Sequence, residues 1–347
     1  MLRDRLRTSA VLIAIVLGLL ALDYFVRVPG ADGVWLLPLL LFFAIGTAWE
    51  IAVMARAGNQ PIRLGVAVAG ATLVASSAAT PFLWAIGGSV YPQDCPVGRL
   101  GWGVLAAAAA VFLSLIAEMR DYGASGETSA RAAPGQAVRR TSMAVFVSVY
   151  VGVPMAMLIA LRGLHAETTA GRFGLAALIT TILVTKVADA GAYFSGRALG
   201  RHKLIPRLSP GKTVEGAIGG VLASTLVAYL ALAYLFPALL DPSASQAVAG
   251  AADGSADVTT AMSETVVKTG LSALLAQPWV GALVLGPVLA ICGMVGDLAE
   301  SLFKRDLGVK DSGNLLPGLG GVWDVTDSLV ASSVPAFFCF ATGVGGP

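Results

Sequence analysis

Acidic side chains recur near the carboxyl end of this 347-residue chain at spacings that suit metal binding. Asp297 and Glu300 are three positions apart, Lys304 follows four positions later, and Asp324 and Asp327 are again three apart. On a helix, residues at these spacings share a face, so the carboxylates of each set would converge. Carboxylate oxygens are the ligands that Mg²⁺ prefers, and flanking basic residues attract phosphate. The pattern predicts a site for a metal-bound polyphosphate.

The same stretch also carries basic residues and a glycine-rich reversal. Lys304-Arg305 and Lys310-Asp311 precede the run from Pro317 to Gly321, whose glycines let the chain turn back and let backbone amides approach a ligand. All of this lies between two apolar segments. Inserting an ionisable group into a bilayer costs about 2.5 to 3.5 kcal/mol, so the accumulation of such groups here indicates function.

A second polar segment lies upstream. It contains Asp189 and the run Ser209-Pro-Gly-Lys212-Thr213. We expect Pro210 and Gly211 to form a turn, Lys212 to supply a positive charge, and a helix to begin just after, where free backbone N–H groups favour a phosphate. The run is not a nucleotide P-loop, because that pattern requires glycine where this chain has Pro206.

Composition places the chain in a membrane. Hydrophobic residues make up 56% and charged residues 13%, and the mean hydropathy is +0.79. A soluble domain of this size would lack polar surface. Apolar runs of roughly the 20 residues that cross a bilayer give an all-α polytopic fold of about nine spans. They are residues 9–26, 34–54, 64–87, 100–117, 142–161, 173–188, 214–236, 279–296 and 322–341.

Basic residues set the expected orientation, because they collect in short cytoplasmic segments. Alternate connections carry most of them if the N-terminus is cytoplasmic. We therefore expect the C-terminus outside and the polar segments facing the cytoplasm, in a multi-pass protein of the cell (inner) membrane. The charges show no aromatic-interleaved patch, which argues against a nucleic-acid partner. The spacing of Cys95, Cys292 and Cys339 supports neither a disulfide framework nor a zinc site.

The chain divides unevenly into two regions. Residues 1–161, rich in small and apolar residues, are predicted to be a five-span scaffold, and residues 162–347 a four-span catalytic region with a flexible external loop near 241–270. Three ionisable residues within spans have simpler explanations. Lys186 is expected to pair with Asp189 or to extend to the interface, Glu50 either to line the cavity or to bond across helices, and Asp23 to be a solvated helix end.

The polar segments resemble the phosphatidate cytidylyltransferases. The family signature is Ser-x-hydrophobic-Lys-Arg, Lys-Asp-x-Gly, His-Gly-Gly and Asp-Arg-x-Asp. Most of it is present here, as are upstream family motifs around residue 189 and at 200–216, so the resemblance is solid over 186–330. The matching positions are Ser301, Lys304, Arg305, Lys310, Asp311, Gly313, Pro317, Gly320, Gly321, Asp324 and Asp327. Two positions depart: Leu319 stands where the family has histidine, and Val325 where it has arginine.

The resemblance implies transfer of a cytidylyl group from CTP to phosphatidic acid, giving CDP-diacylglycerol and pyrophosphate. It implies that Asp297, Asp324 and Asp327 hold Mg²⁺, with a second cation as an option, and that Lys304 assists catalysis. It also implies membrane lipids as partners and raises the option of a homodimer. The expected substrate-binding residues are Ser209, Lys212, Thr213, Arg305, Lys310, Asp311 and Asp189.

Other functions remain open at this point. Acids inside a membrane could couple an ion to transport, although transporters concentrate them at mid-membrane rather than beside a basic loop. A related CTP-dependent lipid kinase would use similar residues. An inactive homologue is a further alternative, because both signature departures fall in the phosphate-binding region.

Overall fold

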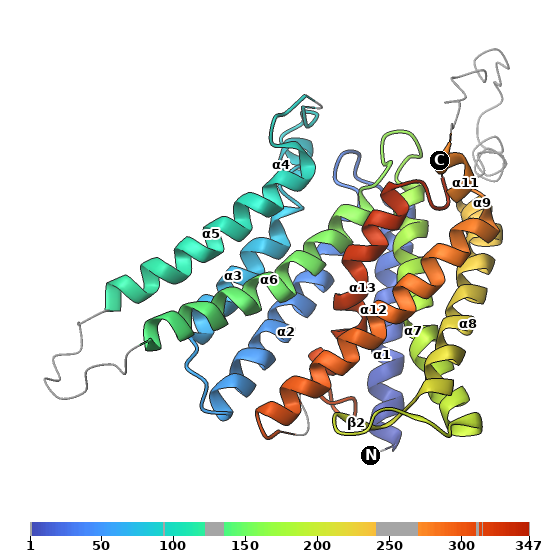
Figure 1. Cartoon of the computed structure of the whole chain (residues 1–347). Helices are drawn as coiled ribbons and strands as arrows, with labels where there is room; N and C mark the ends of the chain where they lie inside the picture. The colour runs from blue at the N-terminus through green and yellow to red at the C-terminus, as the bar shows by residue number, and fades with distance from the viewer. Residues whose placement is uncertain are drawn as a thin grey trace, which may run out of the picture.

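A computed structural model describes residues 2–92, 94–121, 135–240, 270–309, 312–313 and 315–346. It is a bundle of long helices with one short hairpin (Figure 1). The elements are α1 (Leu2–Phe25), α2 (Leu37–Ala57), α3 (Leu64–Ser77), α4 (Phe82–Ile86), α5 (Gly98–Asp121), α6 (Gln136–Arg162), α7 (Arg172–Leu199), β1 (Lys203–Ile205), β2 (Ser209–Thr213), α8 (Val214–Leu230), the π-helical turn η1 (Ala231–Leu235), α9 (Phe236–Leu240), α11 (Leu271–Leu275), α12 (Pro278–Asp306) and α13 (Trp323–Ala341).

Within the described ranges, seven helices are long and apolar enough to cross a membrane, so the protein is a helical multi-pass membrane protein. They are α1, α2, α5, α6, α7, the continuous segment from α8 to α9, and α12. The two other predicted spans are helical but differ from these. α3 has only 14 residues, about 21 Å, which is less than a bilayer core. α13 carries Asp324 and Asp327 in its first turns, which lowers its hydropathy.

The predicted continuous span 64–87 is wrong. Helix α3 ends at Ser77, and α4 begins at Phe82 after a turn in which Thr80 N–H donates to the Ser77 carbonyl. Proline cannot donate to a helical ladder, so Pro81 suits the start of a new helix and not the middle of one. The predicted external loop near 241–270 falls almost wholly outside the described residues.

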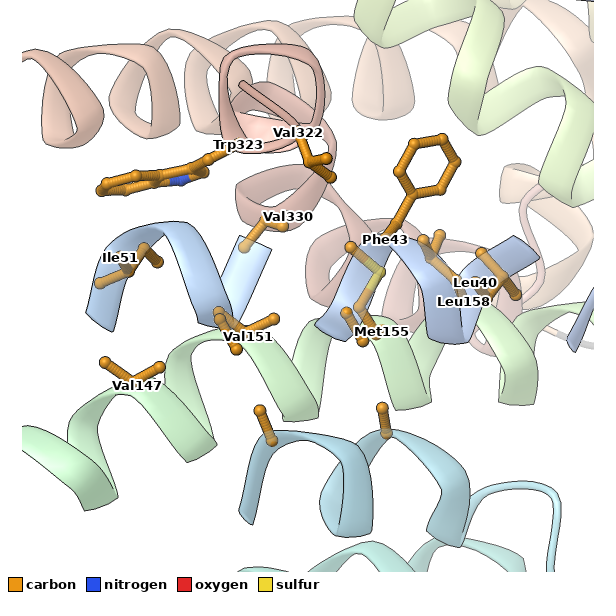
Figure 2. Packing of buried hydrophobic residues seen from close by; sticks show 14 of the residues in the cluster. Leu40, Phe43, Ile51, Val147, Val151, Met155, Leu158, Val322, Trp323 and Val330 are labelled. Atoms are coloured by element: carbon orange, nitrogen blue, oxygen red, sulfur yellow. The ribbon is translucent and has the colours of Figure 1, made fainter. Parts of the chain in front are cut away.

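The largest buried cluster joins the two ends of the chain. Helix α2 lies between α6 and α13, and side chains of all three meet in one apolar core (Figure 2). Ile51 of α2, Val151 of α6 and Trp323 of α13 are almost fully buried there. Burying such side chains contributes about 1.5 to 3 kcal/mol each. The beginning of α13, where the acidic residues lie, is therefore held by the amino-terminal half of the chain.

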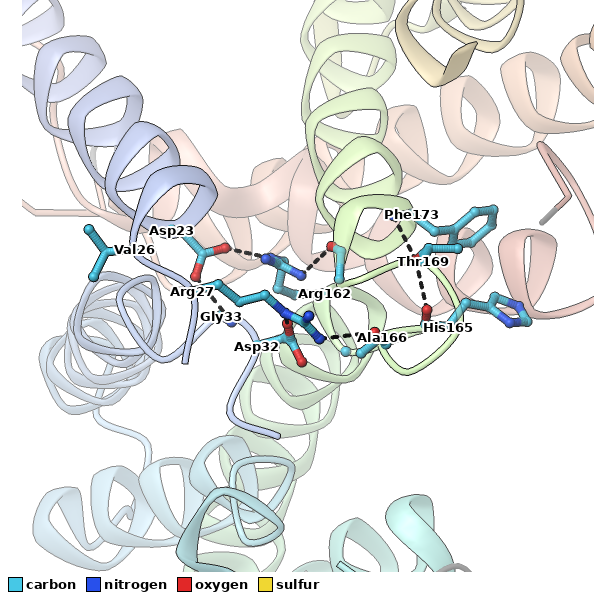
Figure 3. Close-up of polar contacts among 12 residues, drawn as sticks. Asp23, Val26, Arg27, Asp32, Gly33, Arg162, His165, Ala166, Thr169 and Phe173 are labelled. Atoms are coloured by element: carbon cyan, nitrogen blue, oxygen red, sulfur yellow. Dashed lines mark hydrogen bonds and ion pairs between the residues drawn. The ribbon is translucent and has the colours of Figure 1, made fainter. Parts of the chain in front are cut away.

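A buried ion pair fixes the far end of α1. Arg162 Nε at the end of α6 lies 2.6 Å from Asp23 Oδ2, and both side chains are only 3% exposed (Figure 3). Asp23 also accepts a hydrogen bond from Gly33 N, and Arg162 donates one to the Gly171 carbonyl. The prediction of a solvated Asp23 is therefore wrong, because its partner comes from a helix distant in sequence.

Candidate active site

Three carboxylates converge where α12 and α13 pack together. Asp297 and Glu300 come from α12 and Asp327 from α13, and one oxygen of each lies within 4.8 Å of the others. Glu300 and Asp327 are buried, while Asp297 is partly exposed. The helices approach closely at Gly296, where a Cβ atom would lie 2.5 Å from the Asp327 carbonyl oxygen. We refer to these three residues as the acidic cluster.

The acidic cluster suits a hard divalent cation. All its donors are carboxylate oxygens, which Mg²⁺ prefers, and two oxygens on opposite sides of one Mg²⁺ stand about 4.2 Å apart. Two of its members have cationic neighbours: Lys212 Nζ lies 2.7 Å from Asp297, and Lys304 Nζ lies 2.7 Å from Glu300. Among the described residues, no lysine or arginine forms an ion pair with Asp327. A buried carboxylate without such a partner is costly, and a cation would remove that cost.

Asp324 lies next to the acidic cluster but has other partners. Its carboxylate forms an ion pair with Lys304 and accepts a hydrogen bond of 2.7 Å from Gly321 N. Gly320, just before, has a φ of +99°, and a Cβ atom there would lie 2.3 Å from Asp324 Oδ2. The structure thus brings together Asp297, Asp327 and Glu300, whereas Asp324 holds Lys304 and the glycine-rich turn.

Glu50 of α2 caps the N-terminus of α13, the helix that carries Asp324 and Asp327. Its two carboxylate oxygens accept hydrogen bonds from Val322 N at 2.8 Å and Trp323 N at 2.9 Å, and Ser312 Oγ donates at 3.2 Å. A negative charge at a helix N-terminus satisfies free N–H groups and the helix dipole. Of the two roles that the sequence left open for Glu50, bonding across helices is the one that the structure shows.

The upstream segment forms a pocket beside the acidic cluster. The pocket has a volume of about 370 Å³, and its polar lining includes Asp189, Ser209, Lys212, Thr213 and Asp297. Residues from the upstream and downstream segments therefore face one space. The ion pair between Lys212 and Asp297 closes the gap between them.

The local structure of this upstream segment differs from the prediction. Residues 209–213 are strand β2, which pairs antiparallel with β1, so the expected turn at Pro210 and Gly211 is wrong. The helix that was expected to follow is present as α8. Thr213 is its N-cap and accepts a hydrogen bond of 3.1 Å from Gly216 N. The hairpin presents Lys212 at the end of a strand, a more rigid position than a free turn.

Lys186 and Asp189 form a polar bridge from α7 to α13. Lys186 Nζ lies 3.8 Å from Asp189 Oδ2, as the sequence predicted, and donates to the Val325 carbonyl at 2.9 Å. Ser328 Oγ connects the two, accepting from Lys186 at 3.1 Å and donating to Asp189 at 3.0 Å. The bridge places an ammonium group beside the backbone of α13, close to the acidic residues.

The remaining candidates are less tied to the pocket. Arg305 is exposed in the last turn of α12. Lys310 and Asp311 lie outside the described residues. Glu300 joins the acidic cluster although the family resemblance does not name it as a ligand, and the sequence signal for it is its spacing of three positions from Asp297.

Together, the fold and the site define a multi-pass membrane protein in which a pocket lined by Lys212 and Asp297 adjoins a carboxylate cluster, an arrangement that suits a metal-bound phosphate ester. Comparison with known families identifies the family of the chain. The model of the cytidylyltransferase family matches residues 3–342, and the chain belongs to that family.

Several curated relatives share the name phosphatidate cytidylyltransferase. The chain is 36% identical over 167 residues to the one from Haemophilus influenzae, covering 48% of this chain and 46% of the relative. It is 33% identical over 183 residues to that of Bacillus subtilis, covering 53% and 52%, and 40% identical over 165 residues to that of Brucella suis, covering 46% and 45%. The chain thus matches about half the length of these relatives.

Proposed function

We propose that the protein transfers a cytidylyl group from CTP to phosphatidic acid, giving CDP-diacylglycerol and pyrophosphate, as a step of phospholipid biosynthesis. The observation that carries the proposal is the contact between Lys212 and Asp297, which joins the pocket to the acidic cluster. Family membership and the shared name of the relatives support the same reaction.

The proposed reaction is a displacement at phosphorus. An oxygen of the phosphatidic acid phosphate attacks the α-phosphorus of CTP, a new P–O bond forms, and the bond to the β-phosphate oxygen breaks. A phosphate monoester has its second pKa near 6, so the attacking oxygen is ionised at neutral pH and needs no histidine base. Lys212 and Lys304 would offset the charge that builds up on the phosphates, and Ser209 would donate a hydrogen bond to them.

The acidic cluster would hold Mg²⁺ through Asp297, Glu300 and Asp327. When bound, the cation supplies neutralisation of phosphate charge and alignment of the attacking and leaving oxygens. Asp324 would serve chiefly by holding Lys304, a lysine that it shares with Glu300, in place. Asp189 would orient Lys186 and shape the pocket wall.

Lys186 also bears on one departure from the family signature. The signature has arginine at position 325, where this chain has valine. Lys186 brings an ammonium group to the carbonyl of that same residue. We propose that Lys186 supplies the positive charge that Val325 lacks, which supports an active enzyme over a lapsed one.

The proposed topology places the site at the cytoplasmic face of the inner membrane. The N-terminus lies at the same end of the bundle as β2, and the C-terminus lies at the opposite end (Figure 1). An N-terminus inside and a C-terminus outside require an odd number of crossings, which is nine if the short helices α3 and α4 together make one crossing, and they agree with the distribution of basic residues. CTP would then enter from the cytoplasm and phosphatidic acid from the bilayer. A homodimer is an expectation from the family alone.

The deciding experiment is Mg²⁺-dependent synthesis by the purified protein. We expect labelled CTP and phosphatidic acid to give CDP-diacylglycerol and pyrophosphate with wild type and with Asp306→Asn, which changes an exposed acid at the end of α12. Asp327→Asn should lose the product. Wild-type protein that binds CTP but forms no product would point to another lipid acceptor, and protein that binds no CTP would overturn the proposal in favour of transport.

A further inference from the structure

Helix α1 is attached to the bundle in an unusual way. Only 6% of its membrane-spanning window is buried inside the protein, so most of its surface is left for lipid. Its first turns nevertheless make two specific polar contacts. Arg5 Nε donates to the Gly318 carbonyl at 2.7 Å, and Thr8 Oγ1 donates to the Pro317 carbonyl at 2.7 Å.

The segment that receives these bonds is the glycine-rich turn before α13. Leu316 and Gly320 are hydrogen-bonded to each other across it, and Gly318 and Gly320 have φ angles of +81° and +99°. A Cβ atom at Gly318 would lie 2.7 Å from Arg5 N, so α1 and the turn are in backbone contact. Only glycine adopts such angles readily, so the glycines give the turn a shape in which the backbone of α1 can approach it closely.

The turn ends at the proposed reaction site. Gly321 N donates to Asp324, and Asp324 pairs with Lys304, which in turn contacts Glu300 of the acidic cluster. The carbonyl that Arg5 holds is therefore three residues from the amide that holds Asp324. A shift of the turn would move that amide and release the Asp324 carboxylate.

The opposite end of α1 is fixed as well. The buried pair of Asp23 and Arg162 ties it to α6, with Gly33 N as a further donor to Asp23 (Figure 3). The 18 positions between Arg5 and Asp23 correspond to about 27 Å of helix. A rigid rod held at one end by a buried pair keeps a defined position at its other end.

We propose that the first two turns of α1 position the turn formed by residues 317–321 and, through it, Asp324 and Lys304. Arg5 and Thr8 are thus positioning residues for the transfer reaction, supplied by the helix that is least packed against the bundle. The effect of Arg5 and Thr8 on turnover rests on the proposed function, whereas their effect on the turn rests on the contacts alone.

The test uses variants that differ by single groups. Thr8→Val keeps the shape of the side chain but removes the hydroxyl, and Thr8→Ser keeps the hydroxyl. We expect Thr8→Val combined with Arg5→Ala to lower kcat about 30-fold, because two hydrogen bonds of about 1 kcal/mol each are lost. Thr8→Ser should retain wild-type kcat, and Arg7→Ala, which removes an exposed charge from the same helix, should do so too.

A second readout does not depend on catalysis. In a Leu319→Cys background, peptide mass spectrometry would follow maleimide labelling at position 319, in the middle of the turn. We expect labelling to quicken several-fold when the Arg5 and Thr8 donors are removed, and to stay unchanged with Arg7→Ala.

Three results would overturn the inference: unchanged kcat and labelling in the double variant, equal losses in Thr8→Ser and Thr8→Val, or an equal loss in Arg7→Ala. If the wild type forms no product, the proposed function fails, and labelling at position 319 still decides whether α1 holds the turn.

Discussion

Lys212 Nζ on strand β2 lies 2.7 Å from Asp297 Oδ2 on helix α12. This contact joins two polar segments that are far apart in the chain. The lysine side chain is 21% exposed and the aspartate 39%, so the pair lies at the wall of the pocket and not in the core. We therefore expect a ligand phosphate that enters the pocket to compete with Asp297 for Lys212.

Replacing Lys212 should greatly reduce turnover. We expect Lys212→Met to lower kcat/KM for CTP by about 10² to 10³, because it removes a positive charge aimed at the phosphates. Arg207→Met changes an exposed basic residue between the same two strands and should stay within about twofold of wild type. Steady-state formation of CDP-diacylglycerol measures both, and equal activity of Lys212→Met and wild type would remove Lys212 from the site.

Metal binding should depend on Asp327 more than on Asp324. The acidic cluster includes Asp327, whereas Asp324 is held by Lys304 and Gly321 N. We expect Asp327→Asn to weaken Mn²⁺ binding at least tenfold, and Asp324→Asn to weaken it by less. Electron paramagnetic resonance of free Mn²⁺, titrated with purified protein in the absence of CTP, makes the comparison. The reverse order would make Asp324 the more important ligand, and equal losses would agree with the resemblance, which implies that both residues hold the metal.

Glu50→Gln should destabilise the protein without touching a proposed substrate contact. The amide can accept only at one of its two ends, so one of the buried N–H groups of Val322 and Trp323 loses its partner. We expect a loss of about 1 to 3 kcal/mol. Glu167→Gln affects an exposed pair with Arg99 and should cost under about 1 kcal/mol. Thermal unfolding in detergent would show no difference between the two variants if the cap were unimportant.

The pair of Asp23 and Arg162 should behave as a unit. Removing one partner leaves a buried charge alone, so we expect Asp23→Asn and Arg162→Met each to cost about 3 to 5 kcal/mol. The double variant should lose less stability than the sum of the losses in the two single variants. A double-mutant cycle on Tm measures this coupling, and strict additivity would show that the two side chains do not interact.

Tags at the two ends should report opposite sides of the membrane. We expect a fluorescent protein fused to the N-terminus to be bright in the cytoplasm, and alkaline phosphatase fused to the C-terminus to be active outside. An inactive phosphatase with a fluorescent C-terminal fusion would contradict the span count and the orientation together.

The sequence predicted the helical segments well, because long apolar runs leave the backbone no alternative in a membrane. It missed the break at Pro81, since the apolar run resumes at Phe82 and hydropathy alone does not show a turn of a few residues. It also missed strand β2. That strand exists because β1 pairs with it, and pairing between separate segments leaves little local signal.

The sequence predicted which residues lie in the candidate site better than it predicted which of them pair. Asp297 and Glu300 do lie together, as helical spacing indicated, and Asp327 lies with them, as the family resemblance implied. The pairing of Asp324 with Lys304 and with the amide of Gly321 depends on tertiary contacts, which spacing cannot show. The partner of Asp23 was missed for the same reason, because Arg162 belongs to a different helix.

The pairing of Asp23 with Arg162 also sets an order of assembly during synthesis. Helix α1 leaves the ribosome long before α6, so Asp23 has no partner until residue 162 has been synthesised and inserted. During that interval α1 is retained by its own apolar surface. The turn that contacts Arg5 and Thr8 is made later still. Helix α1 is therefore fixed only after α6 has been made, and its contacts with residues 317–318 form only after that segment has been made. A truncated nascent chain has no assembled site.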